Sequence, residues 1–162
     1  MTRKDNIFLE PIKLLDYSEL DYSKKPQFFT DFDVAKSICV PTNNCKPLII
    51  CDCVACINIS DCKVVDTIKG TSLEGQHLSS KKLLIMGTVT FTVYFLIPYI
   101  PHLLIDVDEE APFSVFIIVP EDTNEEGILK LKYMIEDVTA TLLSKTKLFF
   151  NASIFIQYLE NS

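Results

Sequence analysis

The sequence contains no tryptophan, only four glycines and only two histidines. Neither GxGxxG nor Walker A, the glycine-rich patterns that hold nucleotide phosphates, is present. The GxSxG pattern of α/β-hydrolases and the HExxH pattern of zinc proteases are missing as well. Because no catalytic motif is recognisable, we expect a protein that is not an enzyme and that uses no cofactor.

Positive charge is in short supply, since 22 acidic residues outweigh 15 lysines and arginines and leave a net charge of −7. Binding to nucleic acid depends on phosphate contacts made by lysine and arginine. Anionic membrane surfaces attract the same two residues. The charge balance therefore predicts no nucleic-acid partner and no attachment to an anionic membrane.

Long hydrophobic runs are also absent. Charged residues interrupt the first 20 positions before an apolar segment reaches the length of a secretion signal, so we expect no signal peptide. The longest apolar run, residues 91–105, contains two prolines and a histidine and is too short to cross a bilayer. We therefore expect synthesis in the cytoplasm and no insertion into a membrane.

Apolar residues are abundant and alternate with polar ones. The hydrophobic content is 48%, with 11 phenylalanines and six tyrosines, which is enough for one substantial core. From residue 46 onward the alternation has the period of two that is typical of half-buried strands. The positions predicted to face the core are Val89, Phe91, Val93, Phe95 and Ile97; Phe113, Val115, Ile117 and Val119; Leu129, Leu131, Tyr133 and Ile135; and Phe150, Ala152, Ile154, Ile156 and Tyr158.

Further strands are predicted at residues 48–59, 63–71 and 103–107, which brings the total to about seven. Polar turn signals at 79–82, 120–127 and 144–147, and a proline at 112, separate the runs. Short strands at regular spacing, without a long helical window, predict an all-β protein. We expect an antiparallel β-sandwich or jelly roll preceded by an N-terminal arm.

Residues 1–46 have mixed charge and little sustained period, so we assign them to an N-terminal arm or connector and residues 47–162 to a single β-domain. A short helix over residues 11–20 fits the spacing of the apolar residues there. Phe28, Phe29 and Phe32 are too many aromatic residues for a solvated tail. They are our candidates for docking of the arm on another surface, and a loose tail is the alternative.

All six cysteines lie between residues 39 and 62, at Cys39, Cys45, Cys51, Cys53, Cys56 and Cys62. Structural zinc sites need four ligands, usually from two knuckles. Only Cys53 and Cys56 have the C-x2-C spacing, and no second knuckle follows, so we expect no metal site. The segment after Cys56 is typical of a strand rather than a helix, which argues against a thioredoxin-like redox centre.

Disulfide bonds within the chain would need particular turns. Cys39 and Cys45 flank a PTNN turn, and Cys56 and Cys62 could pair across a hairpin. Cys51 and Cys53 are expected on one face of a strand, where a bridge between them has poor geometry. Cys51, Cys53 or Cys56 could instead fill the core as small hydrophobic residues. The remaining interpretation is cross-linking between chains, with Cys39 and Cys45 at the joint and the other four cysteines as candidate partners.

Three segments of the sequence carry a resemblance to a known family. They are GTSLEGQHLSSKKLLIMGTVTFTVYF at 70–95, APFSVFIIVPED at 111–122 and YMIEDVTATLL at 133–143. In this order they resemble the SPOCS domain of spore-coat and spore-morphogenesis proteins in endospore-forming clostridia, over residues 46 to 160. The resemblance implies synthesis in the mother-cell cytoplasm and a final location in the spore coat or on the spore surface, where oxidation follows lysis of the mother cell.

Together, these observations predict a structural subunit of the spore coat or of a spore-surface appendage. We expect a homo-oligomer or polymer that assembles through its N-terminal arm and is locked by disulfide bonds between chains, with other spore-coat proteins as further candidate partners. The alternative is a soluble adaptor that binds another spore-coat morphogenetic protein.

Overall fold

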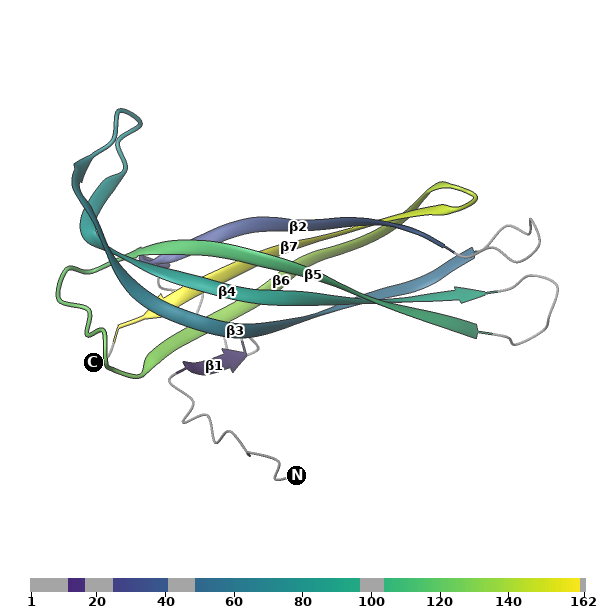
Figure 1. Ribbon diagram of the computed structural model, residues 1–162, viewed down its shortest axis with the longest axis horizontal. Helices are drawn as coiled ribbons and strands as arrows, with labels where there is room; N and C mark the ends of the chain where they lie inside the picture. Colours follow the sequence, from purple (N-terminus) through teal and green to yellow (C-terminus); the bar gives the residue numbers. More distant parts are fainter. Residues whose placement is uncertain (1–11, 17–24, 41–48, 97–103, 161–162) are drawn as a thin grey trace, which may run out of the picture.

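The computed structural model describes residues 12–16, 25–40, 49–96 and 104–160, which form two facing β-sheets (Figure 1). The predicted all-β sandwich is confirmed. The strands are β1 (Ile12–Asp16), β2 (Phe29–Cys39), β3 (Ile49–Thr71), β4 (His77–Leu96), β5 (Leu104–Val119), β6 (Leu129–Ser144) and β7 (Lys147–Leu159). No helix of the described part is long and apolar enough to cross a membrane.

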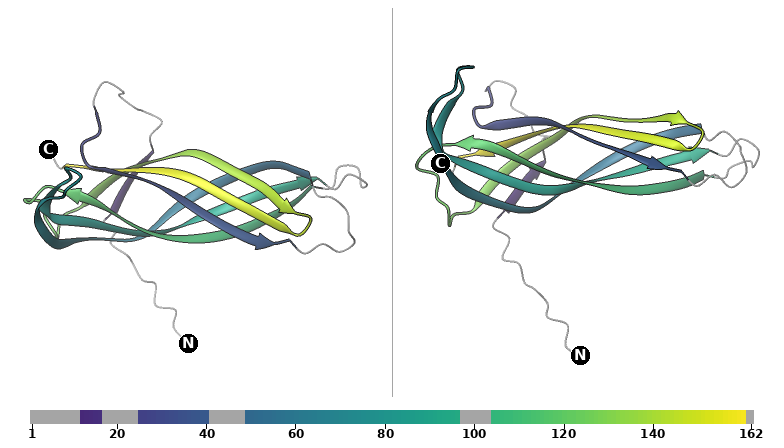
Figure 2. Two further views of the ribbon diagram at one scale, coloured as in Figure 1. Left: turned by 90° about the horizontal axis from the view of Figure 1, so that it is seen from above. Right: turned by 45° about the horizontal axis from the view of Figure 1, so that its top comes forward.

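The two sheets differ in how the chain builds them. One is an antiparallel meander in the order β3-β4-β5, in which each strand pairs with the next along the chain. The other has the order β1-β6-β7-β2, in which β2 and β6 flank β7 antiparallel and β1 adds to β6 in parallel. The N-terminal strands therefore join the C-terminal hairpin (Figure 2).

The core lies between the central strands β4 and β7. Phe91 of β4 and Phe150 of β7 stack across the sheets with ring centroids 5.2 Å apart. The alternation predicted for both strands is confirmed, since every predicted core position in the described parts of β4 and β7 is buried. Ile97, the fifth predicted position of β4, lies outside the described residues.

Two strands are longer than predicted. β5 runs without a break through Pro112, because β4 is its one hydrogen-bonded neighbour among the described residues and a proline is tolerated on such an edge strand. β3 is one strand of 23 residues, where the sequence predicted two. Its alternation is interrupted by register shifts between Ile50 and Asp52, between Ile59 and Asp61, and between Asp66 and Lys69.

Each of the first two register shifts changes whether the odd-numbered or the even-numbered residues of β3 face the core. An extra residue in one strand of a pair sends the following side chains to the opposite face. Between the two shifts the odd-numbered positions, such as Ile57, face the core, whereas beyond the second shift Cys62 and Val64 do so. The strand thus stays packed along its length although its sequence pattern breaks.

The tip of the β3–β4 hairpin projects from the sandwich (Figure 1). The third shift in β3 and a positive φ of 82° at Ser80 in β4 mark where it leaves the body. The turn predicted at residues 79–82 therefore lies inside β4, although the backbone is irregular there. The true turn contains Gly75, which has a φ of 85° and donates to the Ser72 carbonyl at 3.0 Å.

Gly87 and Phe113, which belong to two of the family-like segments, form a cross-strand pair of β4 and β5. A Cβ on Gly87 would lie 2.4 Å from the Asn58 carbonyl oxygen and 2.7 Å from the Phe113 ring. The ring therefore occupies the space that a side chain at position 87 would need. Phe32 of β2, in the opposite sheet, packs against the Phe113 ring with the two ring centroids 5.2 Å apart.

The IED residues of the third family-like segment form another irregularity, in β6. The register shifts between Ile135 and Asp137, so that Glu136 is the extra residue. Before the shift Leu129 and Leu131 are buried, and after it the even-numbered positions, such as Val138, pack on the core. Asp137 is exposed and accepts a hydrogen bond from Thr139 Oγ1 at 3.0 Å. The alternation predicted for β6 therefore applies to its first half only.

The N-terminal segment departs most from expectation. Residues 29–39, which we had assigned to the arm, form β2 and pair with β7 over its whole length, with Val34 only 6% exposed. Residues 12–16, predicted within a short helix, form the strand β1 instead. The sandwich thus takes up a part of the predicted arm, because the alternating apolar residues of β2 complete its core.

Candidate functional site

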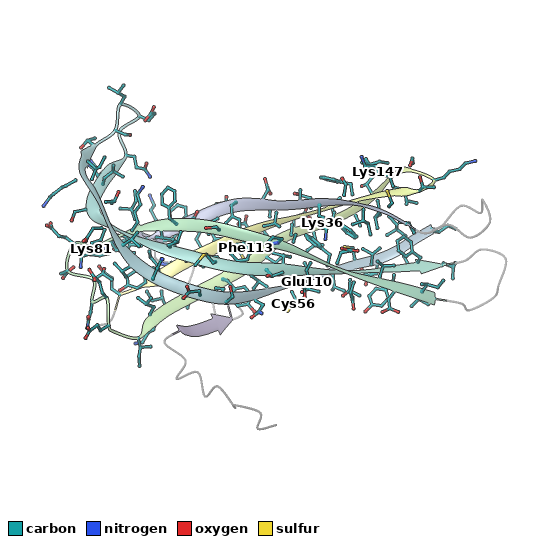
Figure 3. All side chains as sticks on the ribbon, viewed as in Figure 1. Lys36, Cys56, Lys81, Glu110, Phe113 and Lys147 are labelled. Carbon is teal, nitrogen blue, oxygen red and sulfur yellow. The ribbon has the colours of Figure 1, made fainter. Side chains whose placement is uncertain are left out.

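One side of the sandwich is closed by a polar clamp. Lys36 of β2 extends toward β5, where its Nζ lies 2.7 Å from Glu109 Oε2 and donates to the Glu110 carbonyl oxygen at 2.8 Å (Figure 3). The clamp ties the β2 edge of one sheet to the β5 edge of the other. Sequence analysis missed it, because the partners lie far apart in the chain and no local pattern connects them.

The three aromatic residues predicted for arm docking contact this chain's own sheets. Phe28 packs edge-on against Tyr158, with centroids 6.5 Å apart, and Phe29 stacks on Phe155 at 5.2 Å. Phe32 reaches the core and packs on Phe113. Phe29 remains 47% exposed and is the one of the three with substantial free surface.

Phe29 also lines a groove of about 510 Å³ between β2 and β5, together with Phe116, His77 and Gln76. Phe116 is 46% exposed, so the groove presents two aromatic rings to its opening. Its walls come from the start of β2, the C-terminal half of β5 and the turn of the β3–β4 hairpin. The groove offers a contact surface of mixed polarity, with two aromatic rings, at one end of the sandwich.

The other side of the sandwich carries two strand edges. Among the described residues β3 has β4 as its one hydrogen-bonded neighbour. The β6 edge is covered by β1, but only at residues 129–133, in the register Ile12 to Leu129 through Asp16 to Tyr133. Beyond that stretch, β7 is the one strand that pairs with β6 in the described part of the chain. Free backbone donors and acceptors on such edges can pair with an added strand.

Two of the cysteines belong to the core. Cys62 is 9% exposed, and its burial, helped by the neighbouring Asp61 charge, raises the thiol pKa to about 12. Cys53 faces the same core, and its burial, helped by the Asp52 charge, raises its thiol pKa. A raised pKa keeps a thiol protonated and unreactive near neutral pH. The interpretation as a small core residue is thus confirmed for Cys53, and it extends to Cys62, which sequence analysis had not included.

Three cysteines are exposed: Cys39, Cys51 and Cys56. Cys39 ends β2 and Cys51 stands at the first register shift of β3, at the end of the sandwich where β2 stops and β3 begins (Figure 1). Cys56 projects from the outer face of β3 near its middle (Figure 3). The sixth cysteine, Cys45, lies outside the described residues.

The structure corrects two expectations about cysteine pairs. Cys51 and Cys53 do not share a face, because the register shift leaves Cys51 exposed while Cys53 faces the core. Cys56 and Cys62 do not flank a hairpin but lie on one continuous strand, where about 3.3 Å per residue separates them well beyond disulfide reach. No two described cysteines are within disulfide distance.

The C-x2-C pair does not form a metal knuckle. Cys53 faces the core whereas Cys56 faces solvent, so their sulfur atoms point to opposite sides of β3. Among the residues that the structure describes, no group of three or more histidine, cysteine, aspartate and glutamate side chains is placed to hold a metal ion.

Comparison with known proteins assigns the chain to a domain family. No curated protein and no solved structure matches this chain. A family model described as "SipL, SPOCS domain" matches residues 48–143, more than half of the chain and the part that runs from β3 into β6. All three family-like segments lie within that range, and they hold the Gly87–Phe113 pair and the Glu136 irregularity. The chain belongs to the SipL SPOCS domain family.

Proposed function

We propose that this protein is a non-enzymatic structural subunit of the spore coat or of a spore-surface appendage, and that copies join through the N-terminal segment. Family membership supports a sporulation role. The finer proposal depends on one observation, the parallel pairing of β1 with the edge of β6. That edge accepts an added strand, and the same strand from a neighbouring chain could occupy it.

Strand exchange of this kind links one chain to the next. The contact is heterologous, since the N-terminal strand of one copy meets the β6 edge of another, and repetition yields a filament or a ring. The exposed thiols Cys39 and Cys51 lie at the end of the sandwich away from the β1–β6 pair, where cross-links to a neighbour met at that end would make the assembly resist denaturants. Cross-linking is compatible with cytoplasmic synthesis if oxidation follows release from the mother cell.

The test compares assembly of the full chain with that of β1 variants. Because successive amides of a strand point to opposite sides, adjacent prolines at Lys13 and Leu14 remove at least one amide that faces β6. We expect the Lys13→Pro/Leu14→Pro variant to form no filaments by negative-stain electron microscopy. The matched Lys13→Ala/Leu14→Ala variant should assemble, because it keeps both amides.

A shortened chain that starts at Lys25 provides a second, independent test. It removes β1 but keeps β2, which a deletion up to residue 40 would take out of the core. Circular dichroism checks that the sandwich still folds. If the shortened chain assembles as well as the full one, assembly through the N-terminal segment is wrong. Assembly with and without reductant then shows whether disulfides lock the contact.

The second candidate function is a soluble adaptor for another spore-coat morphogenetic protein. The groove with the half-exposed rings of Phe29 and Phe116 favours it, because aromatic rings at an opening are typical of protein contact sites. An adaptor should remain a uniform single particle with and without reductant. A Phe116→Ser variant should then lose its partner while keeping the fold, since Phe116 points away from the core.

A further inference from the structure

The four long edges of the sandwich are not equally protected against pairing with another chain. Charges, prolines, irregularities and covering segments protect natural edge strands. β5 carries Pro112 and exposed acidic residues, and β2 is held by the Lys36 clamp. β6 has β1 over its start and the Glu136 irregularity further on. The regular stretch of β3 between its first two register shifts, residues 52–59, has a single charge and neither lysine nor proline.

Side chains along this stretch show that the β3 edge is open. Cys53, Ala55 and Ile59 face the core yet stay partly exposed, whereas the core positions of the neighbouring strand β4, such as Phe91, are 0% exposed. Val54, on the outer face, is 48% exposed. Ile57 is the one buried residue of the stretch, at 6% exposure, and among the described strands none covers β3 on the side away from β4.

We propose that the stretch Asp52–Ile59 of β3 pairs antiparallel with the same stretch of a second copy. A sheet of two three-stranded halves, in the order β5-β4-β3-β3-β4-β5, would result. The occupant is a second copy because the segment complements itself: it is apolar, short and bounded at both ends by register shifts. This twofold contact is distinct from the heterologous contact made by the N-terminal segment.

The two faces of β3 restrict the register of this pairing. Residues directly opposite in a sheet must lie on the same face, so core-facing positions must meet core-facing positions. In an antiparallel pair around a twofold axis, one residue then stands opposite itself. With Cys56 at the axis, Ala55 meets Ile57, Val54 meets Asn58 and Cys53 meets Ile59, which pairs the core-facing cysteine and isoleucines across the joint.

This register brings two exposed thiols together. Opposite residues of an antiparallel pair have Cα atoms about 4.5 or 5.5 Å apart, and a disulfide spans either distance. Cys56 of each copy would thus form a bond to Cys56 of the other. Two thiols lose two protons and two electrons to an oxidant such as dioxygen or diamide, and one S–S bond forms across the twofold axis.

Diamide oxidation of the full chain tests the thiol arrangement. One variant keeps Cys56 and replaces Cys39, Cys45 and Cys51 with serine, and the matched control keeps Cys39 and replaces Cys45, Cys51 and Cys56. Both retain the core thiols Cys53 and Cys62. At about 10 µM protein, a paired dimer with a millimolar effective thiol concentration should cross-link about a hundredfold faster than random collision. Mass spectrometry should find Cys56 joined to Cys56.

Two charge variants test the register in reductant, where no disulfide contributes. In Val54→Lys/Asn58→Lys, like charges would stand opposite each other twice, and in Val54→Lys/Asn58→Glu, opposite charges would. Both positions are exposed on the outer face, so the fold should remain. We expect the dimer dissociation constant, measured by sedimentation, to be about tenfold higher for the Lys/Lys variant than for the Lys/Glu variant.

Three outcomes overturn the proposal. The Cys56 variant cross-links no faster than the Cys39 control, the mapped bond joins Cys56 to another cysteine, or the Lys/Lys variant associates as tightly as the Lys/Glu variant. None depends on the N-terminal segment, because the Lys13→Pro/Leu14→Pro variant should form the Cys56 dimer while failing to make filaments. The proposed function and this dimer can thus fail separately.

Discussion

Substitution of Gly87 by alanine should destabilise the fold through a clash at the centre of β4. The added Cβ would lie 2.4 Å from the Asn58 carbonyl oxygen, 2.7 Å from Phe113 Cζ and 2.9 Å from Phe113 Cε1. An ordinary carbon–oxygen contact is about 3.3 Å or longer. The β3 and β4 backbones must therefore separate by close to 1 Å at this pair, and the ring of Phe113 must move as well.

Neither adjustment is easy. Asn58 belongs to a strand that is paired with β4, and Phe32 backs the ring of Phe113. Overpacking a close-packed core costs about 1–3 kcal/mol, and the double clash puts this substitution near 3. For a chain of this size, such a change lowers the melting temperature by roughly 6–12 °C.

Urea unfolding in reductant, followed by circular dichroism, measures the free energy of unfolding. Gly70→Ala is the matched control, because nothing lies within 4 Å of a Cβ there; it should change stability by less than about 0.5 kcal/mol. Adding Phe113→Leu to Gly87→Ala should recover part of the lost free energy of unfolding, because leucine removes the clash with the ring whereas the clash with the Asn58 carbonyl oxygen remains. If Gly87→Ala is as stable as Gly70→Ala, the steric argument for this family-like pair is refuted.

Three further predictions concern the thiols, the clamp and β6. Because the Cys62 thiol stays protonated in the folded state up to a pKa of about 12 and ionises near 9 when unfolded, stability should fall as pH rises from 9 to 12, and Cys62→Ala should make that slope in pH-dependent urea unfolding smaller, leaving the contribution of Cys53, whose pKa is also raised. At pH 8 an alkylating reagent should modify Cys39 within minutes but reach Cys62 only in urea, and equal rates read by mass spectrometry would contradict the burial of Cys62. Lys36→Met should cost no more than about 1 kcal/mol, as a partly exposed ion pair does, and a larger loss in urea unfolding would mean that the link to Glu109 is worth more than its exposure allows. Deleting Glu136 should leave the pairing and the core-facing side of β6 intact, because Ile135 and Asp137 already pair with consecutive residues of β7, whereas deleting the regularly paired Thr139 should turn over the residues that follow it and strongly destabilise the sandwich; loss of the cooperative urea transition after deletion of Glu136 would contradict the assigned irregularity.

The sequence predicted the central strands well. β4 and β7 each have a neighbour on both sides and one face in the core, so their apolar residues alternate without interruption from Val89 to Phe95 and from Phe150 to Tyr158. The local sequence pattern is therefore enough to predict such strands and the face that each turns to the core. The two-sheet architecture followed, because strands with one apolar face must cover that face against another sheet.

The irregular strands could not be predicted in the same way. Cys51, Ser60 and Glu136 are the extra residues at three register shifts, and none of these residue types marks such a position in a sequence. The shift at Cys51 separated it from Cys53, which the pattern had placed on the same face. The shift at Ser60 made one long strand look like two. Register depends on which two strands pair, and the sequence of one strand does not identify the strand that it pairs with.

The N-terminal segment was misjudged for a related reason. β2 is an edge strand with modest apolar content, and its place in the core became evident only from its pairing with β7. The predicted site residues include all six cysteines, and five of these lie in the described part of the chain. Their division into core and exposed thiols depended on the shifts, and it was beyond the reach of spacing arguments.

The order of strands in the second sheet has a consequence for synthesis on the ribosome. β3, β4 and β5 pair with their immediate neighbours, so this sheet can form while the chain is still growing. β1 and β2 come first in the chain, yet their partners β6 and β7 come last. The N-terminal strands must therefore wait until β6 and β7 have been synthesised, and a chain that terminates before these strands keeps β1 and β2 unpaired. Only a chain that includes β7 has a complete second sheet, so the topology itself distinguishes chains that contain the C-terminal hairpin from fragments that lack it.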